Sequence, residues 1–310
     1  MKFLTNKSEI DFMGKRRAAV IMSVLLIALS VVSLATRSLN FGVDFTGGLL
    51  LEVGYAGTAD LQDIRDELAG ADFGDAQVQN FGTVSDVLIR MLPRPDVNTA
   101  VLGEQILKVL QTNDSSVVLR RIEFVGPQVG EELTERGGTA MIFALLMILA
   151  YIMLRFQWKF AVGSVVALLH DVILVLGVFS LLQLPFDLSV LAAILAVIGY
   201  SLNDTIVVFD RIRENFRHIR RGSAVAIINT SINQMLGRTI ITSLTTLLVL
   251  FALFILGGEA VRGFSTALII GIVVGTYSSI YTASTTALAL DVTPADLLPS
   301  KQIEDPDGLP

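Results

Sequence analysis

Six apolar stretches constrain this chain more than any other feature of its sequence. A run of about 18 or more apolar residues is long enough to cross a membrane as a helix. The composition agrees, because 53% hydrophobic and 17% charged residues do not suit an ordinary soluble domain. We therefore expect an α-helical membrane protein with six transmembrane helices, over residues 18–36, 138–154, 161–182, 188–209, 239–257 and 264–290.

Positive charge is concentrated in alternate links between these stretches. It occurs in Lys15–Arg17 before the first stretch, in Arg155–Lys159 after the second and in Arg211–Arg221 after the fourth. Short links rich in Lys and Arg stay in the cytoplasm. The pattern therefore predicts that both ends of the sequence, residues 1–17 and 291–310, are cytoplasmic.

The long link at residues 37–137 is expected to form a folded domain outside the cytoplasm. It holds 16 acidic and 8 basic residues, so its net charge is −8. Period-two alternation predicts strands, and amphipathic periodicity predicts helices. The order is βαββαβ, which is typical of a ferredoxin-like α+β unit. The expected strands are 49–55, 76–82, 84–92 and 116–125, and the expected helices are 58–69, capped by Thr58, and 96–111.

No catalytic constellation can be assembled from this sequence. It has no cysteine and only two histidines, both outside residues 37–137, which excludes a Ser-His-Asp or Cys-His set in the outer domain. We therefore expect no enzyme activity, no metal and no cofactor, and nothing indicates nucleic-acid binding. A sheet with an exposed edge could still bind an extended polypeptide.

Two glycine-containing motifs flank the outer domain. The first is Phe41–Gly48, which includes Asp44, Gly47 and Gly48, and the second is Val125–Gly130, which includes Gly126 and Pro127. Glycine permits close backbone approach, and proline stiffens a junction. These residues predict tight turns where the chain leaves and re-enters the membrane.

Polar side chains interrupt the apolar pattern at membrane depth. They are Asn203 and Asp204 in the fourth stretch, His170 and Asp171 in the third, and Arg238, Thr242 and Thr245 at the start of the fifth. A carboxylate in hydrocarbon costs roughly 3 kcal/mol, and such residues usually face a protein interior and carry ions or protons. They are the candidate functional residues of this chain.

Asp204 and Arg238 together suggest proton-coupled motion. If their helices touch, Arg238 can neutralise the ionised Asp204, and protonation of Asp204 would remove that attraction. The alternatives are a static buried ion pair or a fully hydrogen-bonded cluster of Asn203 and Asp204. For His170 and Asp171 a functional and a packing role stay equally open. An intramembrane aspartyl protease is disfavoured, because neither aspartate lies in a Gly-x-Gly-Asp context.

Two further segments have structural interpretations. Small residues recur at every fourth position of the last stretch, with Gly271 and Gly275 at the centre, and such a stripe lets helices pack closely. The link 211–236 alternates basic and apolar residues, which suggests an amphipathic helix on the lipid surface.

Several motifs together resemble the SecF branch of the SecD/SecF family of bacterial protein export. The resemblance covers essentially the whole chain. It depends on Phe41–Gly48, Val125–Gly130, Leu169–Asp171, Gly199–Asn215 with Asp210 and Arg211, Asn229–Leu248 and Gly275–Tyr281.

The resemblance implies a fold of the RND-transporter type and a place in the bacterial inner membrane. It implies SecD, the SecYEG channel, YajC and unfolded precursor polypeptides as partners, and work driven by the proton gradient. It also implies that positions 204 and 238 hold a proton-sensitive acid and a membrane-depth arginine. Two alternatives remain: a scaffold that links SecD to the channel without carrying protons, and a half-transporter for small molecules or lipids.

Overall fold

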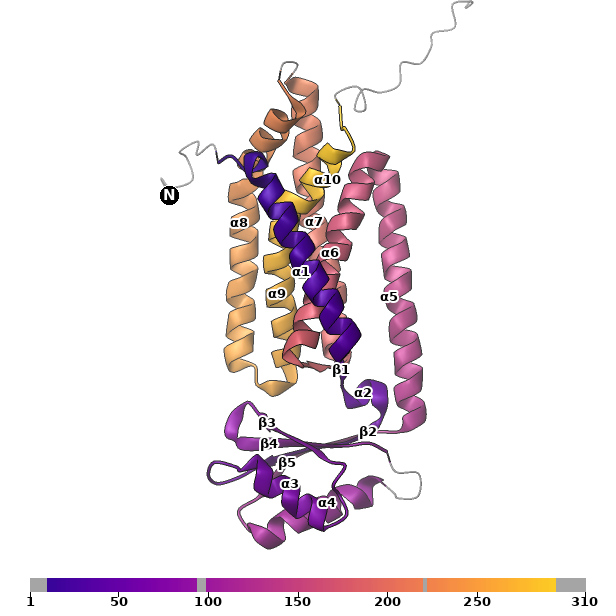
Figure 1. Ribbon diagram of the computed structural model, residues 1–310, viewed down its shortest axis with the longest axis vertical. Helices are drawn as coiled ribbons and strands as arrows, with labels where there is room; N and C mark the ends of the chain where they lie inside the picture. Colours follow the sequence, from indigo (N-terminus) through magenta and orange to yellow (C-terminus); the bar gives the residue numbers. More distant parts are fainter. Residues whose placement is uncertain (1–9, 94–98, 220–221, 294–310) are drawn as a thin grey trace, which may run out of the picture.

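The protein consists of a bundle of long helices and a smaller α+β domain below it (Figure 1). The computed structural model describes residues 10–93, 99–219 and 222–293. Six of its helical segments are long and apolar enough to cross a membrane, which confirms the predicted fold class. They are α1 (Arg16–Arg37), α5 (Pro127–Arg155), α6 (Trp158–Leu182), α7 (Leu188–His218), α8 (Ala224–Leu256) and α9 (Arg262–Ser278), which continues as a π-helical turn (Ser279–Ala283) and α10 (Ser284–Ala289).

Three of these helices extend well beyond the apolar stretches. Helix α5 begins at Pro127, directly below the bundle, with Gly126 as its N-cap residue. Helices α7 and α8 both continue past the apolar region at the end of the bundle away from the α+β domain, and Ser223 caps α8 by accepting a hydrogen bond from Ala226 N. The predicted surface helix over 211–236 is therefore wrong, because its residues belong to the ends of α7 and α8. The chain turns near Gly222, whose φ is +142°.

The centre of the bundle is formed by α6, α7 and α9. In the most apolar 18-residue window of each helix, 56% of the residues are buried in α7, but only 17% in α8 and 6% in α5. Small residues let α9 approach α7 closely: a Cβ atom on Gly271 would overlap Val197, and one on Gly275 would lie 3.1 Å from Ser201 Cβ. The apolar faces of α5 and α8 are left uncovered by the described chain.

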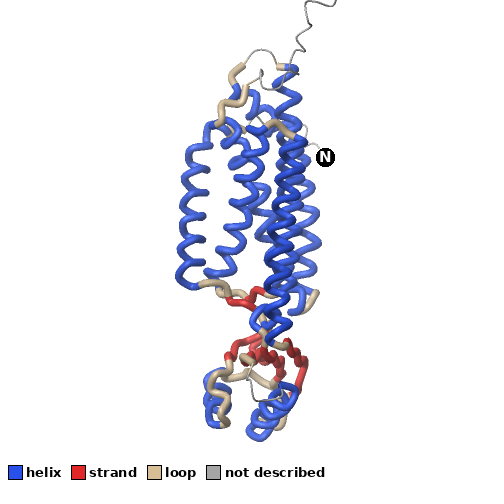
Figure 2. Tube along the Cα trace, turned by 90° about the vertical axis from the view of Figure 1, so that its right-hand side faces the viewer, coloured by secondary structure: helices blue, strands red, loops and turns tan. Residues whose placement is uncertain are grey.

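The outer domain is a four-stranded antiparallel sheet with α3 (Leu61–Gly70) and α4 (Thr99–Asn113) packed on one face, as Figure 2 shows from the side. The strands lie in the order β3-β4-β2-β5, which is the ferredoxin-like arrangement and confirms the predicted βαββαβ order. Leu49, Leu51 and Val53 of the central strand point toward the helices and are fully buried. The strands are β2 (Gly48–Gly54), β3 (Gln77–Phe81), β4 (Thr83–Met91) and β5 (Val118–Val125).

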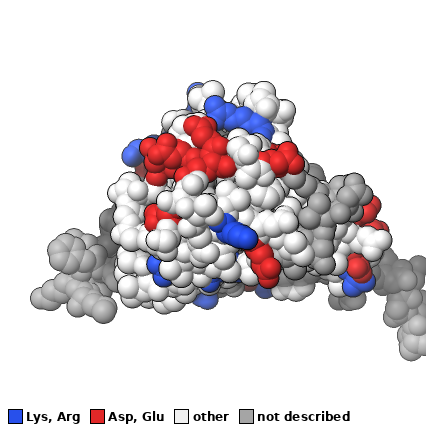
Figure 3. Space-filling model, turned by 90° about the horizontal axis from the view of Figure 1, so that it is seen from below, with Lys and Arg blue, Asp and Glu red and all other residues white. Residues whose placement is uncertain are grey.

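One helix of this domain starts later than predicted. Helix α3 is capped by Asp60, whose carboxylate accepts hydrogen bonds from Gln62 N and Asp63 N, and not by the predicted Thr58. A carboxylate at an N-terminus also benefits from the helix dipole, which a hydroxyl does not. Acidic side chains gather across the outer end of the molecule (Figure 3).

Three short elements connect the domain to the bundle. They are β1 (Asn40–Phe41), the single helical turn α2 (Val43–Thr46) and β6 (Pro185–Phe186). Strand β1 pairs in parallel with β6 in the link between α6 and α7. The chain segment that follows α1 is thereby attached to the link that leads into the start of α7.

Candidate functional site

Asp204 lies inside the bundle, where two hydroxyl groups hold its carboxylate. Thr239 of α8 donates to Oδ1 at 2.8 Å, and Ser279 of the π-helical turn donates to Oδ2. The side chain is 9% exposed. Three membrane helices therefore meet at this carboxylate, and both of its oxygens have a partner.

Arg238 lies close enough to act on Asp204 through its charge, but the described residues hold no ion pair between them. Its side chain is exposed on the outside of α8. The static ion pair weighed from the sequence is therefore not what satisfies Asp204. The hydroxyl partners Thr239 and Ser279 leave the arginine free to act at longer range.

Asn203 does not join this cluster. Neighbouring residues on a helix point about 100° apart, and Asn203 is exposed while Asp204 is buried. Gly199, one turn earlier, is also exposed, and a Cβ atom there would meet nothing within 4 Å. The described chain therefore gives neither residue a partner, and both lie on the outer surface of α7.

Thr242 and Thr245 are exposed on α8 in the same way. The Thr242 hydroxyl donates to the carbonyl oxygens of Arg238 and Thr239, and the Thr245 hydroxyl donates to those of Ile241 and Thr242. Such bonds satisfy a hydroxyl within its own helix. These threonines therefore make no contact with Asp204 through their hydroxyl groups.

His170 and Asp171 form a second buried cluster, on α6. His170 Nδ1 lies 2.9 Å from Asp171 Oδ1, and His170 Nε2 lies 3.2 Å from Ser23 Oγ of α1. The other carboxylate oxygen accepts from Ser201 of α7 and, at 2.7 Å, from Ser278 of α9. His170 and Asp171 are 2% and 1% exposed, so this pair is sealed from its surroundings.

Consecutive serines on one helix connect the two carboxylates. Ser278 bonds Asp171, and Ser279, the first residue of the π-helical turn, bonds Asp204. Turns of π-helix occur frequently at functional sites. Ser201, Ser278 and Ser279 were not among the candidate functional residues predicted from the sequence, although the adjacent serines Ser278 and Ser279 in an apolar helix were a usable signal.

Charged residues at the C-terminal end of α7 form ion pairs of their own. Asp210 pairs with Arg155 of α5 at 2.8 Å and lies 3.5 Å from Arg213, while Arg211 pairs with Glu214 at 2.6 Å. All of these side chains are partly exposed. They hold the ends of α5 and α7 together and take no part in the buried clusters.

The two glycine-containing motifs meet at the junction below the bundle. Gly47 and Gly48 have φ of +66° and +121°, and a Cβ atom on Gly130 would lie 2.7 Å from Gly47 N. Pro127, the first residue of α5, contacts the same turn. Asp44 Oδ2 accepts a hydrogen bond from Leu188 N, the first residue of α7, at 3.0 Å.

Arg90 of β4 also enters this junction and was missed from the sequence. It donates to Thr46 Oγ1 at 2.7 Å and to Asn40 Oδ1 at 3.4 Å. Among the described residues no carboxylate pairs with it, and burial lowers the pKa of its guanidinium. Nothing in its alternating strand context distinguishes it from a solvent-facing arginine.

The N-terminal segment is fixed to α8 by two asparagines. Asn229 accepts from Phe12 N and Met13 N, and the amides of Asn229 and Asn233 both donate to Ile10 O. Met13 is fully buried. The start of α1 is therefore closed against the N-terminal part of α8.

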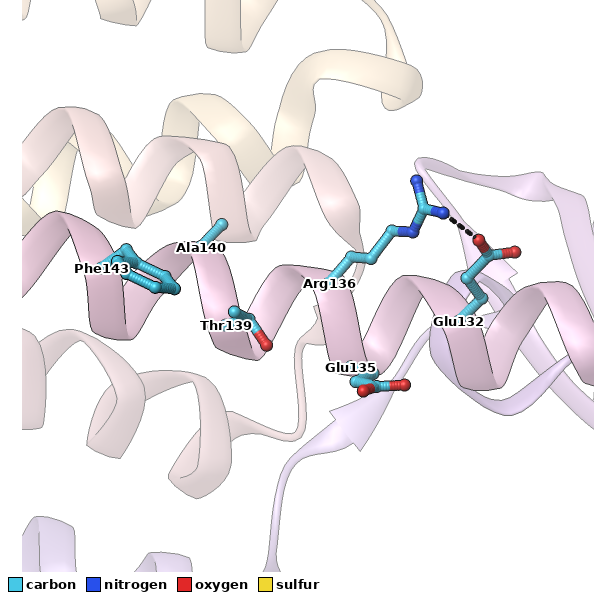
Figure 4. A pocket seen from close by; sticks show the side chains of 6 residues that line it. All are labelled: Glu132, Glu135, Arg136, Thr139, Ala140 and Phe143. Carbon is cyan, nitrogen blue, oxygen red and sulfur yellow. Dashed lines mark ion pairs between the residues drawn. The ribbon is translucent and has the colours of Figure 1, made fainter.

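A hollow of about 580 Å³ lies on the outer part of α5, beside the ion pair of Glu132 and Arg136, and Figure 4 shows that its lining side chains all come from this one helix. The described residues contain no group of histidine and carboxylate side chains arranged to hold a metal.

A six-helix membrane protein with buried carboxylates and an outer ferredoxin-like domain is the class that this fold defines. Its particular family follows from sequence. Residues 105–293 match the family model described as "Protein export membrane protein SecD/SecF, C-terminal", and residues 32–59 match the "SecD/SecF GG Motif". The chain belongs to the SecD/SecF family, and is a multi-pass protein of the bacterial inner membrane.

Relatives match over nearly the full chain. The protein translocase subunit SecF of Vibrio alginolyticus is 52% identical over 96% of this chain and 95% of that protein. SecF of Pseudomonas aeruginosa is 49% identical over 97% of this chain and 98% of that protein. The crystal structure of Thermus thermophilus SecDF, a translocon-associated membrane protein, superposes with a TM-score of 0.84 at 36% identity. It covers 94% of this chain, which spans 40% of the SecDF chain.

Proposed function

We propose that this chain is the auxiliary subunit of a protein-export machine that couples the proton gradient to translocation through protonation of Asp204. Its relatives are named protein translocase subunits, which supports the export role. SecD is the proposed partner in the membrane, since the SecDF relative holds a second, longer part. The SecYEG channel, YajC, unfolded precursor polypeptides and membrane lipid are further proposed partners, with both termini in the cytoplasm.

The observation that carries this proposal is the set of partners around Asp204. Thr239 and Ser279 each offer a hydroxyl, and a hydroxyl both donates and accepts hydrogen bonds. The ionised carboxylate accepts from them, and the protonated acid can donate to one of them after a rotation of that hydroxyl. The site can therefore be satisfied in both protonation states. A carboxylate paired directly with a guanidinium could not be satisfied in both protonation states, because a guanidinium only donates hydrogen bonds.

Arg238 supplies the electrostatic difference between the two states. Its positive charge attracts the ionised Asp204 and no longer does so once Asp204 is protonated. The relative position of α7 and α8 can then change with proton occupancy. The energy is adequate, because one charge crossing 100 mV is worth about 2.3 kcal/mol.

The test is export of a model precursor in vesicles that contain matched amounts of the protein and SecD, with and without an imposed proton gradient. In Asp204→Asn we expect the gradient-dependent part of export to be lost and the rest to remain. Asp210→Asn is the matched control, because it neutralises a carboxylate of the same helix at the cytoplasmic end. An unchanged gradient response in Asp204→Asn would refute the proposal.

A scaffold role is the second candidate, favoured by the uncovered apolar faces of α5 and α8. Other transmembrane helices can bind there, whether or not protons are carried. The same vesicles separate the two roles. If Asp204→Asn assembles with SecD in normal amounts and yet loses gradient-dependent export, assembly alone does not account for the function.

A further inference from the structure

We propose that Asp44 is a positioning residue that ties α7 to the outer domain, so that a displacement of α7 at Asp204 moves that domain. The inference deepens the proposed function and rests on it for the cause of the displacement. Its geometry is independent of that function. Every link in the connection is a contact between described residues outside the Asp204 cluster.

The outer end of α7 is capped by two carboxylates from different parts of the chain. Asp187, the residue before the helix, accepts from Val190 N at 2.8 Å, as an ordinary N-cap does. Asp44 accepts from Leu188 N at 3.0 Å, although it lies 144 residues earlier. The first cap belongs to the helix itself. The second binds the helix to the segment that leads into the outer domain.

Backbone pairing strengthens this attachment. Asn40 and Phe41 pair with Pro185 and Phe186, and Gly42 N donates to Phe186 O at 2.7 Å. The ring of Phe186 packs against Phe41 and Phe45, with centroids 5.8 and 5.7 Å away. The segment around Asp44 is therefore fixed to the start of α7 by backbone bonds, aromatic contacts and a charged cap.

The other side of the same segment is fixed to the sheet. Arg90, from the middle of the domain, donates to Thr46 and Asn40, which flank Asp44 in the chain. Residues 47 and 48 lead directly into the central strand β2. Thr134 of α5 also donates to Phe45 O at 3.2 Å. The segment is thus held between α7 on one side and the sheet on the other.

Helix α7 itself is continuous from its capped end to the proton site. Asp204 lies 16 residues after Leu188, which corresponds to about 24 Å along the axis. The helix contains no proline and no break over its whole length. A shift of α7 at Asp204 therefore reaches Leu188, where Asp44 and the β1–β6 pair pass it to the domain.

Two readouts test this inference in the full chain assembled with SecD in lipid. Infrared absorption of the protonated carboxyl group, assigned by its loss in Asp204→Asn, reports proton binding. Pulsed electron resonance between labels at Asp63→Cys and Leu182→Cys reports the distance from the domain to the bundle. The sequence has no native cysteine, and both side chains are exposed.

Three variants are compared at pH values on either side of the infrared transition. In Asp44→Ala we expect the infrared transition to remain and the pH-dependent distance change to fall at least two-fold. Asp187→Ala is the matched control, since it removes a cap from the same helix but leaves the junction attached. Asp44→Asn should behave as the wild type, because its amide oxygen can accept from Leu188 N.

The outcomes separate the two proposals. If the wild type shows no Asp204 infrared transition, the proposed function fails. If the transition occurs but the distance does not change in the wild type, or changes equally in Asp44→Ala and Asp187→Ala, the inference about Asp44 is overturned. Retained coupling in Asp187→Ala with lost coupling in Asp44→Ala supports it.

Discussion

Asp171 and Asp204, the two buried carboxylates among the described residues, have different surroundings. Asp171 is 1% exposed, bonded to a histidine and two serines, and enclosed by α1, α6, α7 and α9. Asp204 is held only by the hydroxyls of Thr239 and Ser279, and its neighbours in sequence and space, Asn203 and Arg238, face outward. Both sites are buried, but an exposed cation, Arg238, lies near Asp204, and Asp171 is enclosed more completely.

The difference shows why equal burial does not imply equal function. A carboxylate whose partners include a histidine in a sealed core is expensive to disturb, because each partner would lose its own bond. A carboxylate between rotatable hydroxyls, near an exposed cation, can change its charge at a small structural cost. We therefore propose a packing role for Asp171 and proton exchange for Asp204.

The largest expected effect follows from removing Asp171. Asp171→Ala leaves His170 Nδ1 and two serine hydroxyls without their buried partner, and breaking such a pair costs about 3–5 kcal/mol. Thermal unfolding of the purified protein in detergent measures this loss. Asp204→Ala is the matched variant and should lose much less. Equal losses in the two variants would contradict the comparison.

Replacement of His170 should have an intermediate effect. His170→Phe keeps the ring volume but removes the bonds to Asp171 and Ser23, which should cost about 1–3 kcal/mol. The same unfolding measurement applies. Gradient-dependent export, normalised to folded protein, should stay near the wild-type value, and its selective loss would move His170 into the proton-exchange site.

Loss of the charge at position 238 should affect function more than stability. In Arg238→Gln we expect gradient-dependent export to fall about tenfold, equivalent to about 1.4 kcal/mol in the activation free energy. The free energy of unfolding should change little, because the Arg238 side chain is exposed and forms no ion pair with Asp204. Arg238→Lys keeps the charge and should retain most of the export, and an inactive lysine variant would argue for a specific guanidinium contact.

The smallest effect is expected at Asn203. Its side chain is exposed, so Asn203→Ala should change the free energy of unfolding by less than about 0.5 kcal/mol. Binding to SecD, measured by co-purification, shows whether this face of α7 has a partner in the complex. A destabilisation as large as that of Asp171→Ala would mean that Asn203 belongs to the buried cluster after all.

The sequence predicted the elements well, because each depends on local periodicity. Six apolar stretches became six long helices, and the alternating pattern of the outer segment became the predicted antiparallel sheet. It could not show which of Asn203 and Asp204 faces inward, since this depends on how α7 is rotated against its neighbours. The partner Ser201, and Arg90 at the junction, come from distant segments and have no local signature, whereas the adjacent pair Ser278 and Ser279 did offer one.

Predictions from local sequence failed where contacts between distant segments determined the local structure. The link 211–236 has the charge pattern of a surface helix, but Asn215 bonds Ser231 and Gln234 across the turn and keeps α7 and α8 paired beyond the membrane. The two-residue pairing of β1 with β6 likewise could not be predicted from the sequence, because a strand of that length has no periodicity.

The π-helical turn at Ser279–Ala283 gives the last membrane helix a surplus residue. Such a turn interrupts the regular hydrogen bonding of an α-helix and occurs frequently at functional sites. Phe12 and Tyr277 both pack against Tyr281 at this turn. The last membrane helix thus departs from regular α-helical geometry at the residue that holds Asp204, whereas α7, which carries Asp204, is regular over its whole length.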